Sequence, residues 1–244
     1  PENHGAMIGA KKQGVELAGE AEKLGYSQDL CSYFRCDVGQ SLINGGPIGG
    51  LPKPDFMFCC NNICGTVMKW YEVQARYFDI PMVFIDTPYN YEDCNDEIVE
   101  YVKQQFEAAI PEIEKATGRR FNEKKLLRVG ELANEGIQLW NEVLSICSNV
   151  PAPMTCFDAF FYLAPIVTLR GTRAVVDYYK DLKKELQALA DKKVPAIGEE
   201  KYRLVWDNLP IWFKMARLSK TFANYGGALV GDTYTNAWAD NDID

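Results

Sequence analysis

The sequence contains a single histidine, His4, among its 244 residues. One imidazole leaves little room for a Ser-His-Asp triad or for a metal centre built on histidines. Three other motifs are absent as well: the Gly-x-Gly-x-x-Gly of dinucleotide-binding domains, the P-loop, and the His-Glu-x-x-His of zinc proteases. Any chemistry in this chain must therefore come from other side chains.

Long apolar runs and basic stretches are also missing. No run approaches the roughly 18 to 20 apolar residues of a membrane span, and no signal peptide opens the chain. The net charge is −8 and the basic residues form no stripe, which argues against nucleic acid as a partner. We expect a cytoplasmic protein whose partners include neither a membrane nor a nucleic acid.

What remains is an ordinary globular composition, with 47% hydrophobic and 25% charged residues. The length suits one large domain or two smaller ones with a sizeable core. The chain begins with Pro1 rather than Met, and it stops at Asp244 just after a strand-like stretch. We therefore expect a fragment of a longer protein.

Cysteine is the reactive residue that the sequence does supply. Eight are present, and five of them fall within residues 31–64. This clustering favours a metal or iron–sulfur site in a reducing compartment over a set of disulfides. The other three, Cys94, Cys147 and Cys156, fit an interpretation as small buried hydrophobic residues.

Residues 54–90 are predicted to form a strand, a helix and a second strand. The apolar runs Phe56–Cys60 and Met82–Ile85 are typical of buried strands, and the residues between them have helical spacing. Asn61 or Asn62 would cap that helix, which puts Cys64 in its first turn. Unpaired N–H groups and the helix dipole favour a thiolate there. This is also the carboxyl end of a parallel strand, where open α/β sheets place their ligands.

Cys31 is expected in a similar setting. After a loop at residues 1–5, an apolar stripe predicts one helix over residues 7–24. Ser27 or Asp29 would then cap a short helix, with Cys31 in its first turn. The sequence thus predicts two thiols at helix starts.

Beyond residue 95 the pattern is mostly helical, and strands return near residue 200. Amphipathic helices are predicted from about residue 96, from about residue 122 and over 174–190, and a strand–helix–strand pattern over 202–230. The fold class is therefore α/β, with a parallel-sheet Rossmann-like domain, a mostly helical segment and the start of a second α/β domain. The expected boundaries are 1–95, 96–195 and 196–244, and the first strand of the first domain is expected to be missing.

Two thiolates do not complete a [4Fe–4S] site, which needs three or four ligands. Cys60 lies close in sequence, but Cys59 and Cys60 point to opposite faces of a strand and cannot easily serve one metal. A structural zinc site usually shows Cys-x2-Cys pairs, whereas the spacings here are Cys-x4-Cys and Cys-x3-Cys. An iron–sulfur cluster therefore fits better than zinc, and its third ligand stays open.

Several strings of residues spread along nearly the whole chain form a recognisable set. The most specific combines Cys59-Cys60-Asn61-Asn62-Ile63-Cys64 with Lys69-Trp70-Tyr71-Glu72. The others are Pro1-Glu2-Asn3, Gly9-Ala10-Lys11-Lys12, Gly25-Tyr26-Ser27, Leu30-Cys31-Ser32-Tyr33, Phe157-Asp158, Arg170-Gly171 and Glu200-Lys201-Tyr202-Arg203. Together they resemble the 2-hydroxyacyl-CoA dehydratase family, and within it the alpha-type subunit.

The resemblance implies an oxygen-sensitive heterodimer of anaerobic amino acid fermentation, with an alpha-type and a beta-type subunit that each hold a [4Fe–4S] cluster through three cysteines. It implies that an ATP-hydrolysing iron–sulfur activator injects one electron into the substrate. The resulting ketyl radical expels the 2-hydroxyl group, so that an (R)-2-hydroxyacyl-CoA becomes an enoyl-CoA. Carried over by motif, Cys31 and Cys64 are cluster ligands, and Glu2 is a candidate polar or acid–base group beside the substrate.

Two alternatives stay open. Benzoyl-CoA reductase subunits share the fold that the resemblance implies, so ring reduction is the alternative within the family. A zinc-stabilised or metal-free α/β subunit that only scaffolds a partner is the alternative outside catalysis. The sequence does not determine which acyl chain is bound.

Overall fold

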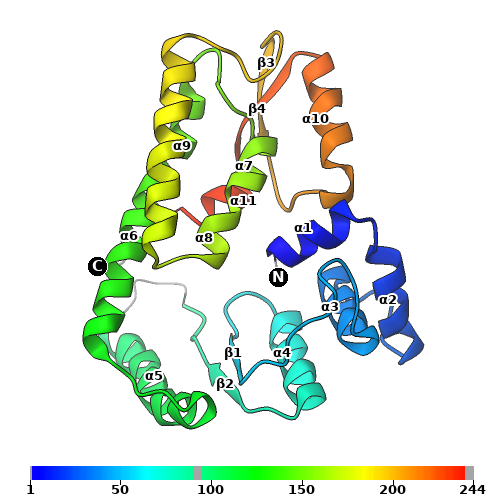
Figure 1. The fold of residues 1–244 in the computed structure, drawn as a ribbon, viewed down its shortest axis with the longest axis vertical. Coiled ribbons are helices and arrows are strands. Elements are labelled where there is room, and N and C mark those ends of the chain that lie inside the picture. Colours follow the sequence, from blue (N-terminus) through cyan, green and yellow to red (C-terminus); the bar gives the residue numbers. More distant parts are fainter. Residues whose placement is uncertain (1, 91–94, 240–244) are drawn as a thin grey trace. The chain divides into compact units, whose positions relative to one another are not determined.

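The structure is a computed structural model that describes residues 2–90 and 95–239 (Figure 1). The chain divides into two compact units. One, which we call the cysteine-rich unit, is Lys11–Asn122; the other, the C-terminal unit, joins Pro1–Ala10 to Glu123–Asp244. The domain boundaries expected at residues 95 and 195 rest on the order of helices and strands along the chain. Whether they separate domains stays a prediction.

The cysteine-rich unit contains a pair of parallel strands with helices around it. Cys60 lies opposite Ile85 in the register of this pair, which confirms the predicted strand–helix–strand segment. Val83 and Ile85 are buried together with Ala109 from the last helix of the unit. The elements are α2 (Gly14–Lys23), α3 (Ser32–Ile43), β1 (Met57–Cys60), α4 (Gly65–Phe78), β2 (Met82–Ile85) and α5 (Asp96–Thr117).

The close packing of α3 on α2 depends on a glycine at residue 39. A Cβ atom there would lie 1.8 Å from the carbonyl oxygen of Leu17, so any larger residue would push the two helices apart. Phe34 of α3 and Ala21 of α2 are buried in one cluster with Trp70 of α4. The position of α3 is therefore set by both neighbouring helices.

The N-terminal stretch forms two helices, and the prediction of a single helix over residues 7–24 is wrong. The first, α1 (Glu2–Ala10), is separated from α2 near Lys12, whose backbone has φ 57°. This left-handed conformation cannot continue a right-handed helix. The loop expected at residues 1–5 is also wrong, because α1 begins at Glu2. The apolar spacing runs on through the break, so periodicity alone does not reveal it.

The two longest helices begin where the sequence predicts them. α5 follows Asn95, whose side-chain oxygen accepts a hydrogen bond of 3.0 Å from the N–H of Ile98. It ends at Gly118 with φ 68°, a conformation that glycine adopts without strain. α6 begins at Glu123. The predictions of helices from about residue 96 and from about residue 122 are confirmed.

The C-terminal unit has one large hydrophobic core. Trp140 of α6 and Tyr179 of α9 are fully buried, with ring centroids 5.1 Å apart. β3 and β4 pair in parallel, which confirms the strand–helix–strand pattern predicted over residues 202–230. Besides α1, the elements are α6 (Glu123–Ser145), η1 (Ile146–Ser148), α7 (Cys156–Tyr162), α8 (Ala164–Thr168), α9 (Arg173–Asp191), β3 (Tyr202–Trp206), η2 (Trp212–Lys214), α10 (Met215–Asn224), β4 (Gly227–Asp232) and α11 (Thr233–Asn236).

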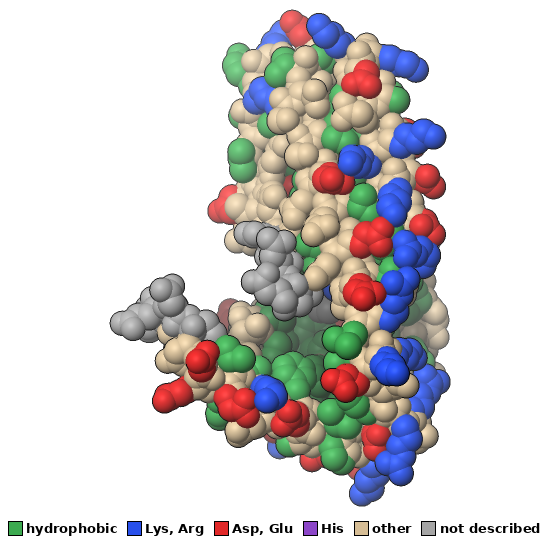
Figure 2. All heavy atoms as spheres, turned by 90° about the vertical axis from the view of Figure 1, so that its left-hand side faces the viewer, with side chains coloured by type: hydrophobic (Ala, Val, Ile, Leu, Met, Phe, Trp, Pro, Cys, Tyr) green, Lys and Arg blue, Asp and Glu red, His purple; other side chains and the backbone are tan. Residues whose placement is uncertain are grey.

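Acidic and basic side chains lie side by side where α6 and α9 meet the solvent (Figure 2). Lys180 pairs with Glu135 at 2.6 Å and Lys183 pairs with Glu142 at 2.9 Å, in each case between the two helices. Exposed pairs of this kind add little to stability. The mixed signs are typical of a solvated helix face.

The fold class is α/β, as predicted, with two parallel strand pairs among long helices in the described residues. The Rossmann-like arrangement of the sheet stays a prediction. Within residues 2–90 and 95–239, no helix combines the length and the apolar character that crossing a membrane requires.

Candidate functional site

Cys31 and Cys64 each occupy the N-cap position of a helix, one residue before the first turn in which the sequence placed them. Cys31 precedes α3 and Cys64 precedes α4, and both side chains are exposed. Their carbonyl oxygens accept hydrogen bonds from Arg35 at 3.1 Å and Val67 at 3.2 Å. The first-turn predictions are corrected by one residue, and both thiols remain at helix starts.

The residues expected to cap these helices have other partners. The hydroxyl of Ser27 accepts a hydrogen bond of 3.2 Å from the N–H of Asp29, in a local turn ahead of α3. Asn61 bonds across the sheet instead: its Oδ1 accepts from the N–H of Thr87 at 2.8 Å and from the Thr87 hydroxyl at 2.6 Å. Its Nδ2 donates to the carboxylate of Asp86. The N-cap residues of α3 and α4 are therefore Cys31 and Cys64, and none of the predicted capping residues.

The end of β2 is tied in turn to α5. The side chain of Gln105 accepts from the N–H of Asp86 at 2.7 Å and donates to the Asp86 carbonyl at 2.8 Å. The hydroxyl of Tyr101 donates to the Asp86 carboxylate at 2.8 Å, and this bond raises the pKa of Tyr101. The carboxyl ends of both strands, α5 and the start of the loop to Cys64 thus form one hydrogen-bonded network.

Side-chain hydrogen bonds join α3 and α4 at two positions along each helix. Oδ2 of Asp37 accepts a hydrogen bond of 2.6 Å from the indole N–H of Trp70 and another of 2.6 Å from Nε2 of Gln74. One turn further on, the hydroxyl of Ser41 donates to Oε1 of Gln74 at 3.2 Å.

The positions of these hydrogen bonds along the two helices show where the two N-cap cysteines lie. Asp37 and Trp70 each lie six residues after an N-cap cysteine, and Ser41 and Gln74 each lie ten residues after one. Residues nearer the start of α3 bond residues nearer the start of α4, and this order of the contacts indicates that the two helices begin at the same end of the pair. Both thiols therefore belong to that end.

The amino-terminal end of this helix pair favours anionic ligands. The first N–H groups of a helix lack acceptors within the helix, and the helix dipole adds positive potential there. In the described part of the chain, neither Cys31 nor Cys64 caps its helix with a side-chain hydrogen bond. The arrangement therefore places two exposed thiols at the starts of two helices, where the first N–H groups favour negative charge.

The other cysteines of this unit differ from these two. Cys36 and Cys59 are buried, and burial raises the pKa of both thiols. Cys60 is half-buried, with its Sγ 2.7 Å from Oδ1 of Asn62. Among the residues that the structure describes, no three His, Cys, Asp or Glu side chains are grouped so as to hold a metal ion. The third cluster ligand stays open, as the sequence left it.

Two cysteines of the C-terminal unit are core residues. Cys147 and Cys156 are buried; burial raises the pKa of Cys147 to about 12 and also raises that of Cys156. Their interpretation as small hydrophobic residues is confirmed, whereas Cys94 lies outside the described residues. The last predicted site residue, Glu2, begins α1, and its role beside a substrate stays a prediction.

Other strings of the resemblance have structural roles. Asp158 accepts hydrogen bonds from the N–H and the hydroxyl of Thr155, at 2.8 and 2.9 Å, in a capping box at the start of α7. Glu200 pairs with Arg203, whose guanidinium also donates at 2.6 Å to a backbone carbonyl of η1. These contacts hold a helix start and a loop of the C-terminal unit in place.

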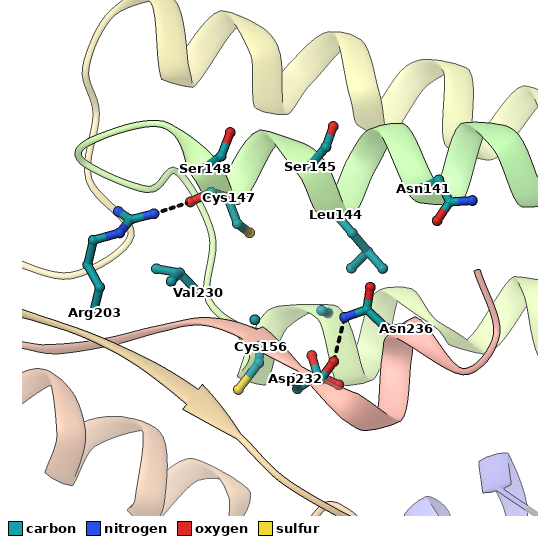
Figure 3. Close-up of a pocket in the computed structure, with 12 residues that line it drawn as sticks. Asn141, Leu144, Ser145, Cys147, Ser148, Cys156, Arg203, Val230, Asp232 and Asn236 are labelled. Carbon is teal, nitrogen blue, oxygen red and sulfur yellow. Dashed lines mark hydrogen bonds between the residues drawn. The ribbon is translucent and has the colours of Figure 1, made fainter. Parts of the chain in front are cut away.

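A pocket of about 450 Å³ lies at the carboxyl end of β4 (Figure 3). Its buried carboxyl group, Asp232, has a pKa raised by burial and accepts from the N–H and the hydroxyl of Thr235, at 2.5 and 2.7 Å. The amide of Asn141 donates to the Ala239 carbonyl at 2.6 Å. Sequence reasoning missed this pocket, for which the signal was a carboxyl group directly after an apolar strand. Asp232 and Asn141 thus both bond within the chain.

A comparison with known protein families identifies the family of this chain. The family model described as "2-hydroxyglutaryl-CoA dehydratase, D-component" matches residues 4–244. The chain belongs to this family. The resemblance found in the sequence is thereby confirmed.

The chain is also similar to named enzyme subunits. The chain is 41% identical over 243 residues to the (R)-2-hydroxyisocaproyl-CoA dehydratase alpha subunit of Clostridioides difficile, covering 98% of this chain and 59% of that protein. It is 33% identical over 240 residues to the (R)-phenyllactyl-CoA dehydratase alpha subunit of Clostridium sporogenes, with coverage of 98% and 59%. It is 30% identical over 256 residues to a benzoyl-CoA reductase subunit of Thauera aromatica, with coverage of 96% and 57%. The chain thus spans about three fifths of the length of these relatives.

Proposed function

We propose that this chain is the cluster-binding part of the alpha-type subunit of a 2-hydroxyacyl-CoA dehydratase, which converts an (R)-2-hydroxyacyl-CoA to an enoyl-CoA and water. The observation that carries the proposal is the placement of Cys31 and Cys64 at the N-caps of two helices that begin at the same end of a tied pair. The two relatives named as dehydratases, at 41% and 33% identity, support elimination of water as the reaction.

A [4Fe–4S] cluster is the cofactor that we propose for these thiols. Clusters of this type are held by cysteine thiolates, both candidate side chains are exposed, and the N–H groups of two helix starts favour negative charge beside them. The third thiolate would come from Cys60 or from a segment of the complete protein that lies outside this chain. When bound, the cluster would supply one-electron transfer and a Lewis-acidic iron.

The residues of this chain would hold and orient that site. Asn61 fixes the start of the loop that carries Cys64, and the ties between α3 and α4 hold the helix that begins after Cys31. By family motif, Glu2 would be the polar or acid–base group beside the substrate. In this proposal the hydrogen-bonded network positions the cysteines, and the carboxylate of Glu2 transfers the proton.

A radical route explains why a cofactor is needed. Expelling a hydroxyl group next to an unactivated β-proton is difficult for acid–base side chains alone, so a cofactor must carry the chemistry. In the proposed route the substrate thioester gains one electron and forms a ketyl radical, the 2-hydroxyl group leaves as water with a proton, a β-proton is lost, and the electron is returned. The route requires a beta-type partner subunit and an ATP-hydrolysing iron–sulfur activator as the source of the electron.

The decisive experiment offers substrates to the complete heterodimer with its activator, ATP and a reductant, purified without oxygen. We expect enoyl-CoA from (R)-2-hydroxyisocaproyl-CoA or (R)-phenyllactyl-CoA, and no consumption of benzoyl-CoA. Ring reduction is the second candidate because of the 30% identity to the benzoyl-CoA reductase relative, and turnover of benzoyl-CoA alone would establish it. A preparation free of iron would instead support the scaffold alternative.

A further inference from the structure

We propose that Asp37 is a positioning residue that keeps the sulfur atoms of Cys31 and Cys64 at a fixed separation. The inference rests on the proposed function of these two thiols and adds a residue that none of the family strings contains. Asp37 lies on α3 and is half-buried. Its carboxylate acts on α4, the helix that begins after the other cysteine.

Two donors from α4 converge on one oxygen of Asp37. The indole N–H of Trp70 and the amide of Gln74 each donate to Oδ2 at 2.6 Å. Trp70 is 7% exposed and Gln74 is 3% exposed, so water competes weakly for these bonds. Hydrogen bonds to an ionised carboxylate are shorter and stronger than neutral ones. The charge of Asp37 therefore gives a directional tie between two helices that apolar contacts alone would leave free to slide.

The tie acts close to the cysteines. Asp37 and Trp70 each lie six residues from an N-cap thiol, which is about 9 Å of helix at 1.5 Å per residue. The other polar ties lie deeper, since Ser41 bonds Gln74 and the hydroxyl of Tyr77 donates to the Ser41 carbonyl at 2.9 Å. If the Asp37 tie is lost, the deeper ties hold the far ends of the helices together while the ends that carry the thiols can separate.

Apolar packing should keep the cysteine-rich unit folded when Asp37 is replaced. The rings of Phe34 and Trp70 meet edge to face with centroids 6.4 Å apart, and Phe34 is buried on α2 and α4 together. This packing holds α3 in place but does not select one register, because the hydrophobic effect is non-directional. A variant at residue 37 should therefore fold, but the position of α3 along α4 should be less fixed.

The test measures how readily the two thiols can be bridged in the complete subunit without iron. A short bis-maleimide is added, and the Cys31–Cys64 cross-linked peptide is quantified by mass spectrometry after proteolysis. Asp37→Ala removes the acceptor, whereas Asp37→Asn keeps an oxygen for the same donors. Glu22→Gln is the matched control, because Glu22 pairs with Arg35 of α3 but ties it to α2.

We expect the initial cross-linking rate to fall about tenfold in Asp37→Ala, the lower end of the contribution of a hydrogen bond to a charged group. The rate should fall about threefold in Asp37→Asn, because its neutral oxygen accepts weaker hydrogen bonds, and it should stay within about twofold of wild type in Glu22→Gln. In the iron-loaded subunit, Asp37→Ala should broaden the paramagnetic resonance of the reduced cluster, and Asp37→Asn should broaden it less. An unchanged rate in Asp37→Ala overturns the proposal, as does the absence of a Cys31–Cys64 cross-link in wild type.

Two further measurements keep the outcome decisive. If Asp37→Ala does not fold, Trp70→Phe removes one donor and keeps the aromatic ring, and a rate equal to wild type would then overturn the proposal. The iron content of wild type reports separately on the proposed function. An iron-free wild type whose cross-link still depends on Asp37 would reject the cluster and support the positioning role.

Discussion

Asn61, just after β1, accepts two hydrogen bonds from Thr87, just after β2: one from the backbone N–H at 2.8 Å and one from the hydroxyl at 2.6 Å. One short side chain thereby joins the carboxyl ends of two parallel strands. The same amide donates to Asp86, so it bonds three polar groups in the segment that follows β2. The loop that leads to Cys64 starts from this fixed point.

Replacement of Asn61 by alanine should therefore destabilise the cysteine-rich unit. We expect Asn61→Ala to lower the free energy of unfolding by about 2 kcal/mol, because it leaves the Thr87 donors without their acceptor. Urea denaturation of the complete subunit measures this. The control is Asn62→Ala, since Asn62 is exposed and contacts the thiol of Cys60; its cost should stay below about 0.5 kcal/mol. Equal losses in the two variants would contradict the bridging role.

Cluster content should depend on the two N-cap cysteines. Cys31→Ser or Cys64→Ser should remove most of the iron and sulfide from the complete subunit, because a serine hydroxyl does not replace a thiolate ligand. Cys147→Ser should retain both, since Cys147 is a buried core thiol. Iron and sulfide assays under anaerobic conditions provide the measurement. Normal iron in both single variants would reject the ligand assignment.

Stability at alkaline pH should depend on Cys147. Burial raises the pKa of its thiol from an ordinary value near 9 to about 12. The folded state therefore keeps a proton that the unfolded state releases above pH 9, so this group's contribution is full below pH 9 and declines as pH rises toward 12. Each pH unit in that window costs about 1.4 kcal/mol.

Comparison of wild type with Cys147→Ala isolates this effect. Between pH 9 and 10.5, the free energy of unfolding of the variant should fall less steeply, by about 1 kcal/mol per pH unit, while near pH 7 both proteins should show the same pH dependence. Chemical denaturation at a series of pH values gives the two slopes. Parallel slopes above pH 9 would show that the thiol is not shielded as the structure describes.

The capping box at α7 should contribute stability and leave cluster content unchanged. Thr155→Ala or Asp158→Asn should lower the free energy of unfolding by about 1 kcal/mol, because the first variant removes the capping hydroxyl and the second removes the carboxylate charge that the Thr155 donors and the helix start favour. Asp177→Asn on the exposed face of α9 is the matched control and should be nearly neutral. Thermal denaturation together with an iron assay distinguishes the two roles. Loss of iron in Asp158→Asn at unchanged stability would assign this residue to the site instead.

Glu2 should affect turnover and spare the cluster. As the family motif places it beside the substrate, Glu2→Gln in the complete subunit should lower kcat by about 100-fold, the lower range for loss of a general acid or base, with normal iron content. The measurement pairs steady-state kinetics with an iron assay. Unchanged turnover at full iron content would make Glu2 a bystander.

The sequence by itself determined most of the secondary structure and the family. Apolar periodicity and local caps predicted the strands around Cys60 and Ile85 and the helices that begin near residues 96 and 122, because these signals lie within a few neighbouring residues. Cysteine spacing separated the five cysteines within residues 31–64 from isolated ones such as Cys147, and only the structure showed that Cys36 and Cys59 of the clustered set are buried. The strings around Cys31 and Cys64 identified the family.

Only the tertiary structure decided which residues meet. Asn61 was free to cap a helix by sequence order, yet it bonds Thr87 because two parallel strands bring their ends together. The equal depth of Asp37 and Trp70 in their helices, which sets Cys31 and Cys64 at one end, depends on a contact between residues 33 positions apart. Such contacts depend on the packing of whole helices and strands, and local propensity carries no information about them.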